Sequence, residues 1–380
     1  MSDTGTAAAP SFSRPRPAAK RYRRGLVVGK FAPLHRGHEL LIARALRECE
    51  EVVILSYQKP EIPGYPPEVR ERWLAALFPQ ATRLVLDDAR VRALLPPGVA
   101  PVPVPGNGAE PVEDRRFCGF VCERVLGVTV DAVFTSEEYG DGFADELTRC
   151  FRERRPGAPA VRHVCVDLQR LQRPISGTLL RGDVHGHRRW LSPAVYASFV
   201  RRVCLLGGEA TGKTTLAREL ARMLGTRWVP EHGRKVWTEK GGRLDFEDME
   251  RIARAQAERE DELARRANRY LLCDTSPLTT LFFSRHLFGA ATPELERMAE
   301  RRYDLTVLCA PDFPFVQDGI RHGGDFRHRQ HEWYVRELES RGIPYLLVTG
   351  SVDERIDQLR AAILSLPISD PLVRPQDPPA

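Results

Sequence analysis

Apolar runs and amphipathic segments alternate along the chain in two series. In the first series, strands are predicted at 25–29, 52–55, 83–86 and 130–134, and helices at 37–48, 68–78 and 113–126. In the second series, strands are predicted at 203–206, 227–229, 270–273, 305–308 and 345–348, and helices at 212–224, 245–268, 277–288, 329–340 and 352–365. Strands that alternate with helices favour parallel sheets with right-handed crossovers. The pattern therefore predicts an α/β fold of two doubly wound parallel-sheet domains.

The length of 380 residues suits two such domains. We expect a disordered basic tail at 1–24, a first domain at 25–190, a short helical linker at 191–202, a second domain at 203–366 and a flexible tail at 367–380. Because the linker runs directly into a predicted strand, we expect the two domains to lie close together.

Two features of the first series have more than one interpretation. Residues 95–112 are rich in Pro and Gly and predict a surface loop, either a spacer or a segment beside the substrate. Trp73 lies in a predicted helix, where it either packs in the core or stacks on a substrate base. The apolar neighbours of Trp73 favour the core.

The sequence GKFAPLHRGH at 29–38 links the first strand to its helix. Ligands of open α/β sheets bind at such strand-to-helix turns, and the amides at a helix start favour phosphate. Lys30, His35 and His38 form a donor cluster suited to a polyphosphate. The candidate nucleotide-binding residues of this turn are Gly29, Phe31 and Gly37.

The sequence ISGTLLR at 175–181 supplies further anion donors. Ser176 can cap a helix whose amides face an anion, and Arg181 offers a planar guanidinium. With Thr178, these residues complete the candidate site of the first domain. By itself, this segment is also compatible with an ordinary helix cap.

The sequence GGEATGKTT at 207–215 follows a strand and opens a helix, and it fits the P-loop pattern G-x-x-x-x-G-K-[ST]. In such a loop the backbone amides surround phosphates, the lysine reaches the β- and γ-phosphates, and the hydroxyl that follows binds Mg²⁺. The residues that fill these positions and their neighbours are Gly207, Gly208, Gly212, Lys213, Thr214 and Thr215.

Two acidic residues follow strands of the second series. Glu231 lies just past the strand at 227–229, and Asp274 ends the strand at 270–273. Asp274 could hold Mg²⁺ with Thr214, or it could hold the substrate ribose. Either acid could be the general base of a kinase, and the sequence leaves that choice open.

The segment 316–329 combines glycines with arginines and suits a mobile lid over transferring phosphates. Arg321 and Arg327 are its candidate phosphate ligands. A plain basic loop is the alternative.

The charge changes this picture little. The formal charge is +6, and residues 1–24 hold six basic residues against one acidic residue. The rest of the chain is therefore nearly neutral, so we expect no nucleic-acid partner. Because no apolar run approaches the roughly 18 residues of a membrane span, we expect no membrane partner. The scattered cysteines favour a cytoplasmic protein. The eight cysteines form no CxxC pair and are expected to be reduced thiols.

The two motifs of the first domain resemble the nucleotidyltransferase superfamily with HxGH and ISxTxxR signatures, which implies a Rossmann-like fold. Together with RERWLAALFP, VFTSEEYG, PEHGRKVW, CDTSPLTT and VQDGIRHGGDFR, they resemble NadR-type bifunctional proteins over about 25–366. The resemblance implies phosphorylation of nicotinamide riboside by the P-loop kinase domain and adenylyl transfer from ATP to nicotinamide mononucleotide by the first domain, giving NAD and pyrophosphate.

The resemblance further implies roles for the site residues. Lys30, His35 and His38 would steady charge on the transferred and leaving phosphates, and Ser176, Thr178 and Arg181 would hold the β- and γ-phosphates of ATP. ATP and Mg²⁺ are the expected cofactors. Some family members begin with a helix-turn-helix repressor domain. The 24-residue tail is too short for one, so a DNA-binding repressor activity is not expected.

Two alternatives stay open on the residues alone. The motifs bind ATP and say little about the acceptor, so the same chemistry could act on another nucleoside or phosphate. A nucleotide-sensing regulator with little turnover is the second alternative, although a pure sensor does not need an intact set of lysines and histidines. A homo-oligomer is possible.

Overall fold

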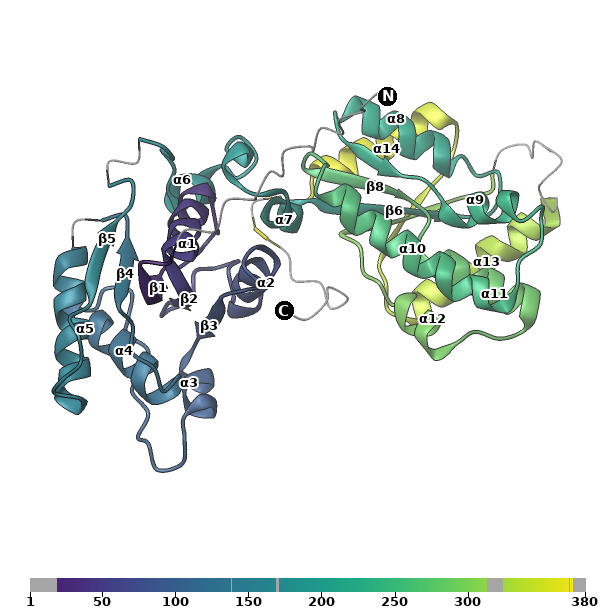
Figure 1. Ribbon diagram of the computed structural model, residues 1–380. Helices are drawn as coiled ribbons and strands as arrows, with labels where there is room; N and C mark the ends of the chain where they lie inside the picture. The colour runs from purple at the N-terminus through teal and green to yellow at the C-terminus, as the bar shows by residue number, and fades with distance from the viewer. Residues whose placement is uncertain (1–18, 138, 169–170, 313–323, 369, 372–380) are drawn as a thin grey trace, which may run out of the picture.

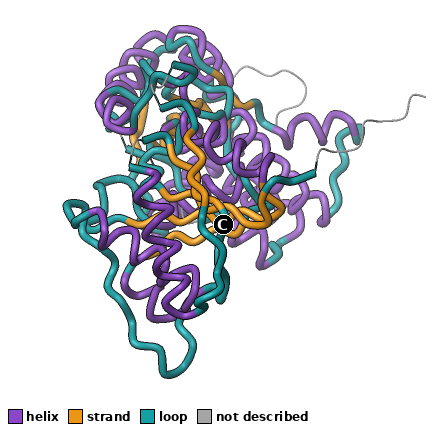
Figure 2. Tube along the Cα trace, turned by 60° about the vertical axis from the view of Figure 1, so that its left-hand side comes forward, coloured by secondary structure: helices purple, strands orange, loops and turns teal. Residues whose placement is uncertain are grey.

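The computed structural model describes residues 19–137, 139–168, 171–312, 324–368 and 370–371. The described chain forms two α/β lobes, each built on a five-stranded parallel sheet with helices on its faces (Figure 1). Figure 2 shows the strands of the sheets enclosed by helices. The predicted fold class of two doubly wound domains is confirmed.

The sheet of the first domain has the order β3-β2-β1-β4-β5. Its strands are β1 (Tyr22–Val28), β2 (Cys49–Tyr57), β3 (Thr82–Leu86), β4 (Ala132–Thr135) and β5 (Arg162–Cys165). Its helices are α1 (Arg36–Glu48), α2 (Pro67–Leu77), α3 (Asp88–Leu94), α4 (Pro111–Phe120) with a π-helical turn (Val121–Val125), α5 (Gly140–Arg154) and α6 (Gly177–Gly182). The strand order reverses between β1 and β4, which places a ligand crevice at the carboxyl end of β1.

The sheet of the second domain has the order β10-β9-β6-β8-β7. Its strands are β6 (Arg201–Gly207), β7 (Arg227–Val229), β8 (Tyr270–Asp274), β9 (Leu305–Cys309) and β10 (Tyr345–Val348). Its helices are α8 (Lys213–Met223), α9 (His232–Glu239), α10 (Phe246–Ala264), α11 (Pro277–Phe288), α12 (Pro293–Met298), α13 (Gly324–Ser340) and α14 (Val352–Leu364). The central strand β6 pairs with β8 and β9 and leads into the P-loop.

The predicted linker helix at 191–202 is wrong in its extent. Within it the structure has only the short helix α7 (Pro193–Tyr196) and a 3₁₀ turn (Ala197–Phe199), and β6 already begins at Arg201. The helix cannot continue because Arg201 and Arg202 are needed as sheet partners of Tyr270 and Leu271. Both arginines are buried. Because charged residues ordinarily predict exposed positions, the sequence pattern did not indicate that the strand begins at Arg201.

Other boundaries also differ from the prediction. β1 begins at Tyr22, inside the expected tail, because Tyr22 and Arg24 pair with Cys49 and Glu51 of β2. The sequence pattern missed five elements, which are α3, α5, α9, α12 and β5. Most of them are short, and short elements carry few periods of the hydrophobic pattern.

Trp73 packs in the core, as predicted, and is 2% exposed. Its ring stacks on Phe199, with the ring centroids 6.1 Å apart, and its Nε1–H donates to the Ser198 hydroxyl at 2.9 Å. Because Ser198 and Phe199 lie in the connection between the domains, Trp73 fixes α2 against that connection.

The described residues after α14 return to the first domain. The Arg201 guanidinium donates to the carbonyl of Asp370 at 2.8 Å and to that of Pro367. His185 contacts the carbonyl of Ile368 through Nε2 at 2.9 Å. The expected flexible tail is thus bound over part of its length.

No helix in the described ranges is both long and apolar enough to cross a membrane. All eight cysteines are free, and six of them are buried.

Candidate active sites

The first candidate site lies where β1 ends and α1 begins. His35 is the N-cap of α1 and is 6% exposed. The His35 and His38 rings stack with centroids 3.6 Å apart and planes at 16°. The structure therefore brings together the two imidazoles of the HxGH motif, as their spacing predicted.

The hydrogen bonds of these rings favour one tautomer of each imidazole. Nδ1 of His35 accepts from the His38 backbone N–H, and Nδ1 of His38 accepts from the His35 backbone N–H, each at 3.4 Å. A neutral imidazole that accepts at Nδ1 carries its proton at Nε2. Both rings can then act as Nε2–H donors, which is the role that a developing phosphate charge requires.

Two glycines of the motif serve close packing. A Cβ on Gly29 would lie 2.9 Å from the Phe31 ring, and one on Gly37 would lie 3.0 Å from Cε1 of His35. Gly29 thus leaves room for the close approach of the Phe31 ring. Phe31 is 1% exposed and packs edge-to-face on His38 at 5.0 Å, so its side chain supports the histidines.

The second motif of this domain lies against the first. Arg181 donates from Nη1 to the carbonyl of Ala32 at 2.6 Å and from Nη2 to the Thr178 hydroxyl at 3.0 Å. Ser176 caps α6 by accepting from the Leu179 N–H at 3.2 Å. Two segments about 150 residues apart in sequence thus form one cluster of anion donors.

Lys30 is exposed, and its backbone carbonyl is bound by a buried hydrogen-bond network that the sequence did not reveal. The Ser56 hydroxyl donates to the Lys30 carbonyl at 3.2 Å and accepts from Arg70 at 2.8 Å. Arg70 is fully buried and pairs with Glu61 at 2.8 Å. An arginine inside an amphipathic helix gives no sequence signal for such a role.

The second candidate site is the loop between β6 and α8. Gly207, Ala210 and Gly212 have φ values of +143°, +57° and +83°, so the backbone reverses repeatedly. Nζ of Lys213 donates to the carbonyls of Gly207 and Gly208 at 3.0 and 2.8 Å. The loop has the curled path that a phosphate cradle needs.

Thr214 and Asp274 meet at the end of this loop, as expected. The Thr214 hydroxyl donates to Oδ2 of Asp274 at 2.5 Å. Asp274 is 1% exposed, and its Oδ1 has no hydrogen-bond partner among the described residues. Burial raises the pKa of this carboxyl, while the charge of Lys213 and the Thr214 hydrogen bond oppose that rise. A buried carboxylate oxygen without a partner beside a hydroxyl fits the oxygen ligand set of Mg²⁺.

Glu231 belongs to the same electrostatic cluster. Burial and the charge of Asp274 raise its pKa, whereas the charges of Lys213 and Arg234 lower it. Nε of Arg234 lies 3.5 Å from the Glu231 carboxylate. Arg234 lies three residues after Glu231, in the first turn of α9. Its mostly exposed side chain brings a positive charge to the site, which the sequence motifs did not indicate.

The structure describes only residues 324–329 of the segment 316–329 that the sequence predicts to be a lid. Arg327, on α13, is 6% exposed and donates from Nη2 to the Pro311 carbonyl at 3.2 Å. A Cβ on Gly208 would lie 2.5 Å from the Arg327 carbonyl oxygen, so α13 packs directly on the P-loop. Gln330 accepts from the Glu209 N–H at 3.0 Å, a contact that the sequence did not suggest. Arg321 lies outside the described residues, and Thr215 is exposed in the first turn of α8.

The chain is similar to several known proteins. The AAA domain family matches residues 202–355. The trifunctional NAD biosynthesis/regulator protein NadR of Escherichia coli is 29% identical over 348 residues, which cover 85% of this chain and 78% of that protein. The protein of the same name from Salmonella typhimurium is 30% identical over 317 residues, covering 79% and 72%.

Solved structures of NadR share the fold. A crystal structure of NadR in complex with NAD and AMP-PNP aligns with a TM-score of 0.61 and 19% identity over 94% of this chain and 100% of that chain. A NadR structure in complex with NR aligns with a TM-score of 0.61 and 18% identity over 92% and 98%.

The fold and the curated relatives define a class, a two-domain α/β transferase that binds nucleotides. The similarity to curated relatives narrows that class. The chain belongs to the NadR family, and it is an enzyme of NAD biosynthesis.

Proposed function

We propose that each domain catalyses one step of NAD salvage. The second domain, 203–366, phosphorylates nicotinamide riboside with ATP. The first domain, 25–190, transfers the adenylyl group of ATP to the resulting nicotinamide mononucleotide. This proposal rests on the Arg181–Ala32 hydrogen bond, which joins the two motifs of the first domain. The same chain also contains a P-loop, whose Thr214 contacts Asp274.

In the first domain, the 5′-phosphate of the mononucleotide attacks the α-phosphorus of ATP and pyrophosphate leaves. The nucleophile is already an anion, so no general base is required. Lys30 and the Nε2–H groups of His35 and His38 stabilise the charge that develops on the phosphates, and Ser176, Thr178 and Arg181 hold the β- and γ-phosphates. Catalysis then rests on positioning and preorganised charge, and removing one such donor costs on the order of 10²–10³ in rate.

In the second domain, the amides of the P-loop and Lys213 hold the phosphates of ATP. Thr214 and Asp274 are the residues that would hold Mg²⁺, which supplies positive charge to the phosphates when bound. Asp274 is engaged with the Thr214 hydroxyl, whereas Glu231 is not, so we assign metal binding to Asp274 and the general base to Glu231. A carboxyl with a raised pKa accepts a hydroxyl proton more readily than an ordinary one does.

The test is an acceptor screen with purified protein, ATP and Mg²⁺. Nicotinamide riboside should yield nicotinamide mononucleotide and then NAD, and supplied mononucleotide should yield NAD and pyrophosphate, as followed by chromatography. Other nucleosides and mononucleotides are included in the same screen. Turnover of another acceptor alone would refute the pyridine assignment, and the lack of any product would refute both reactions and favour a sensor.

A further inference from the structure

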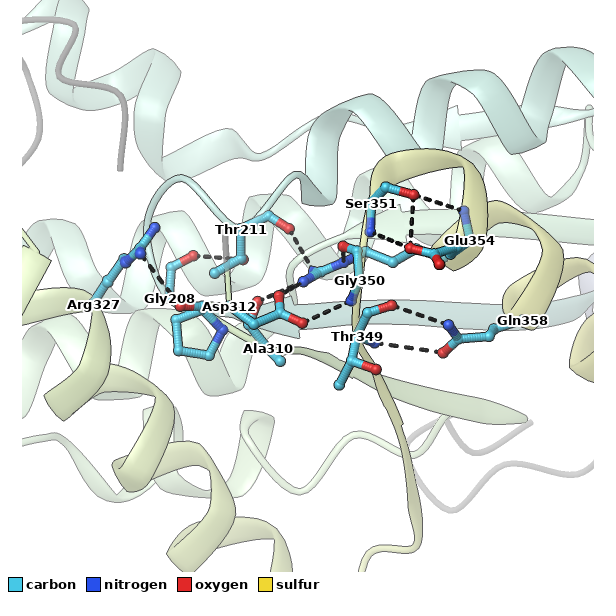
Figure 3. Close-up of polar contacts among 12 residues, drawn as sticks. Gly208, Thr211, Ala310, Asp312, Arg327, Thr349, Gly350, Ser351, Glu354 and Gln358 are labelled. Carbon is cyan, nitrogen blue, oxygen red and sulfur yellow. Dashed lines mark hydrogen bonds and ion pairs between the residues drawn. The ribbon is translucent and has the colours of Figure 1, made fainter. Parts of the chain in front are cut away.

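A buried arginine outside the P-loop motif is bound to the P-loop. Arg355, on α14, is fully buried, and its guanidinium contacts several polar groups of the domain. Its Nε donates to the Gly350 carbonyl at 2.8 Å, its Nη1 to the Thr211 carbonyl at 3.2 Å and its Nη2 to the Ala310 carbonyl at 2.9 Å. The guanidinium also pairs with Asp312. Figure 3 shows these acceptors converging from three separate segments of the domain.

The segments around Arg355 are themselves fixed. Asp312 accepts from the Gly350 N–H at 2.7 Å, which locks the end of β9 to the turn after β10. The Gln358 side chain bonds both the N–H and the carbonyl of Thr349, at 3.4 and 3.0 Å. Arg355 therefore reaches the P-loop from segments that are hydrogen-bonded to one another.

The contact with Thr211 sets the direction of an amide in the P-loop. Thr211 is fully buried and lies between Ala210 and Gly212, both of which have positive φ. In a planar trans peptide the C=O and the following N–H point in opposite directions. Because Arg355 holds the Thr211 carbonyl, the Gly212 N–H of the same peptide points away from Arg355.

We infer that Arg355 is a positioning residue of the kinase site, which holds the P-loop in its phosphate-binding form through the Thr211 carbonyl. This inference rests on the proposed kinase function. Pro311 extends the same scaffold to α13, because its carbonyl accepts from Arg327, whose backbone packs on Gly208. One guanidinium thus joins the P-loop, the end of β9 and the start of α14.

The test compares Arg355→Lys with a matched control, Arg301→Lys. Arg301 is also a buried arginine of this domain, but it pairs with Glu260 and Asp261 and lies just before the amino end of β9, whereas the P-loop follows the carboxyl end of β6. For each variant, the KM for ATP, the KM for the nucleoside and kcat of the kinase are measured, together with the melting temperature. Adenylyl transfer to supplied mononucleotide serves as an internal control.

Arg355→Lys should lower kcat/KM for ATP by about 10–100-fold, mainly through KM, because small displacements of a binding group have effects of this size. The KM for the nucleoside and the adenylyl transfer rate should stay within about twofold of wild type. Arg301→Lys should lower the melting temperature without raising the KM for ATP. Wild-type kcat/KM in folded Arg355→Lys would overturn the inference, as would an equal rise in the KM for ATP in an equally destabilised Arg301→Lys.

Asp312→Asn provides a second variant in case Arg355→Lys does not fold. Asp312 is 35% exposed, and Asn keeps an acceptor for Arg355 while removing the charge. This variant should raise the KM for ATP by about threefold, because a neutral acceptor bonds a guanidinium more weakly. An unchanged KM would contradict the inference.

A binding measurement separates this inference from the proposed function. In calorimetry with a non-hydrolysable ATP analogue, wild type should show two binding events, and Lys213→Ala should lose one of them. Arg355→Lys should weaken that same event. If wild type phosphorylates no nucleoside, the proposed kinase reaction is wrong, but a selective weakening would still support the role of Arg355. Unchanged binding of the analogue would overturn that role.

Discussion

Replacing Asp274 with Asn should move activity and stability in opposite directions. The carboxyl is 1% exposed, its Oδ2 accepts from Thr214 at 2.5 Å, and its Oδ1 has no partner in the part of the chain that the structure describes. Because burial raises its pKa in the folded state, the ionised carboxylate destabilises the fold at neutral pH. Asn has nearly the same shape, keeps an acceptor for Thr214 and carries no charge.

The stability gain of Asp274→Asn can be given as an order of magnitude. Relief of a functional residue's destabilisation is typically worth about 0.5–2 kcal/mol, or about 2–4 °C in melting temperature per kcal/mol for a domain of this size. The loss of a negative neighbour for Lys213 opposes the gain only weakly, since Nζ already donates to two carbonyls. The gain should be full at pH 7 and vanish below about pH 4, where Asp is protonated in the unfolded chain as well.

The kinase rate of Asp274→Asn should fall by about 10²–10³, because the charge that would hold Mg²⁺ is removed. Thermal unfolding without nucleotide or metal gives the stability, and formation of nicotinamide mononucleotide from the riboside gives the rate. NAD formation from supplied mononucleotide should be unchanged. A variant that is less stable than wild type at pH 7, or one that keeps more than about a tenth of the kinase rate, would refute the reasoning.

Three further substitutions test other parts of the structure. Gly208→Ala should abolish kinase activity and spare adenylyl transfer, because its Cβ would lie 2.5 Å from the Arg327 carbonyl; measurable kinase turnover with a normal KM for ATP would contradict the packing. Arg181→Met should slow NAD formation from mononucleotide by about 10²–10³ and leave the kinase rate intact, which parallel assays of the two products check. Asp248→Asn should cost about 1 kcal/mol at pH 7 in denaturant unfolding, because Asp248 accepts from the Asp245 N–H and pairs with Lys240. Those contacts lower the pKa of Asp248 to about 2, so the loss should shrink as pH falls from about 4 toward 2, and a loss that is constant over this range would exclude the electrostatic cause.

The sequence predicted those parts of both sites whose residues lie close together along the chain. The P-loop and the HxGH motif each lie between one strand and one helix, so residue spacing alone fixes their geometry. The sequence also paired Ser176–Arg181 with the HxGH motif, but only through family resemblance. The Arg181–Ala32 hydrogen bond that joins the two segments depends on the tertiary fold.

The residues that sequence reasoning missed are mostly buried polar groups. Arg70 and Arg355 are fully buried, yet arginine in a helix ordinarily predicts an exposed face. Arg201 and Arg202 misled the linker prediction in the same way, since both begin a buried strand. Their partners are backbone carbonyls and acids far away in sequence, and hydrophobic periodicity carries no information about such pairs.

The central claim is that the chain holds two separate active sites that act in succession. The most direct test assays Lys213→Ala and His38→Ala with nicotinamide riboside, ATP and Mg²⁺, separately and mixed. Lys213→Ala alone should form no mononucleotide yet convert supplied mononucleotide to NAD, and His38→Ala alone should accumulate mononucleotide with little NAD. The mixture should restore NAD formation from the riboside. Loss of both reactions in either single variant, or no restoration on mixing, would contradict the account.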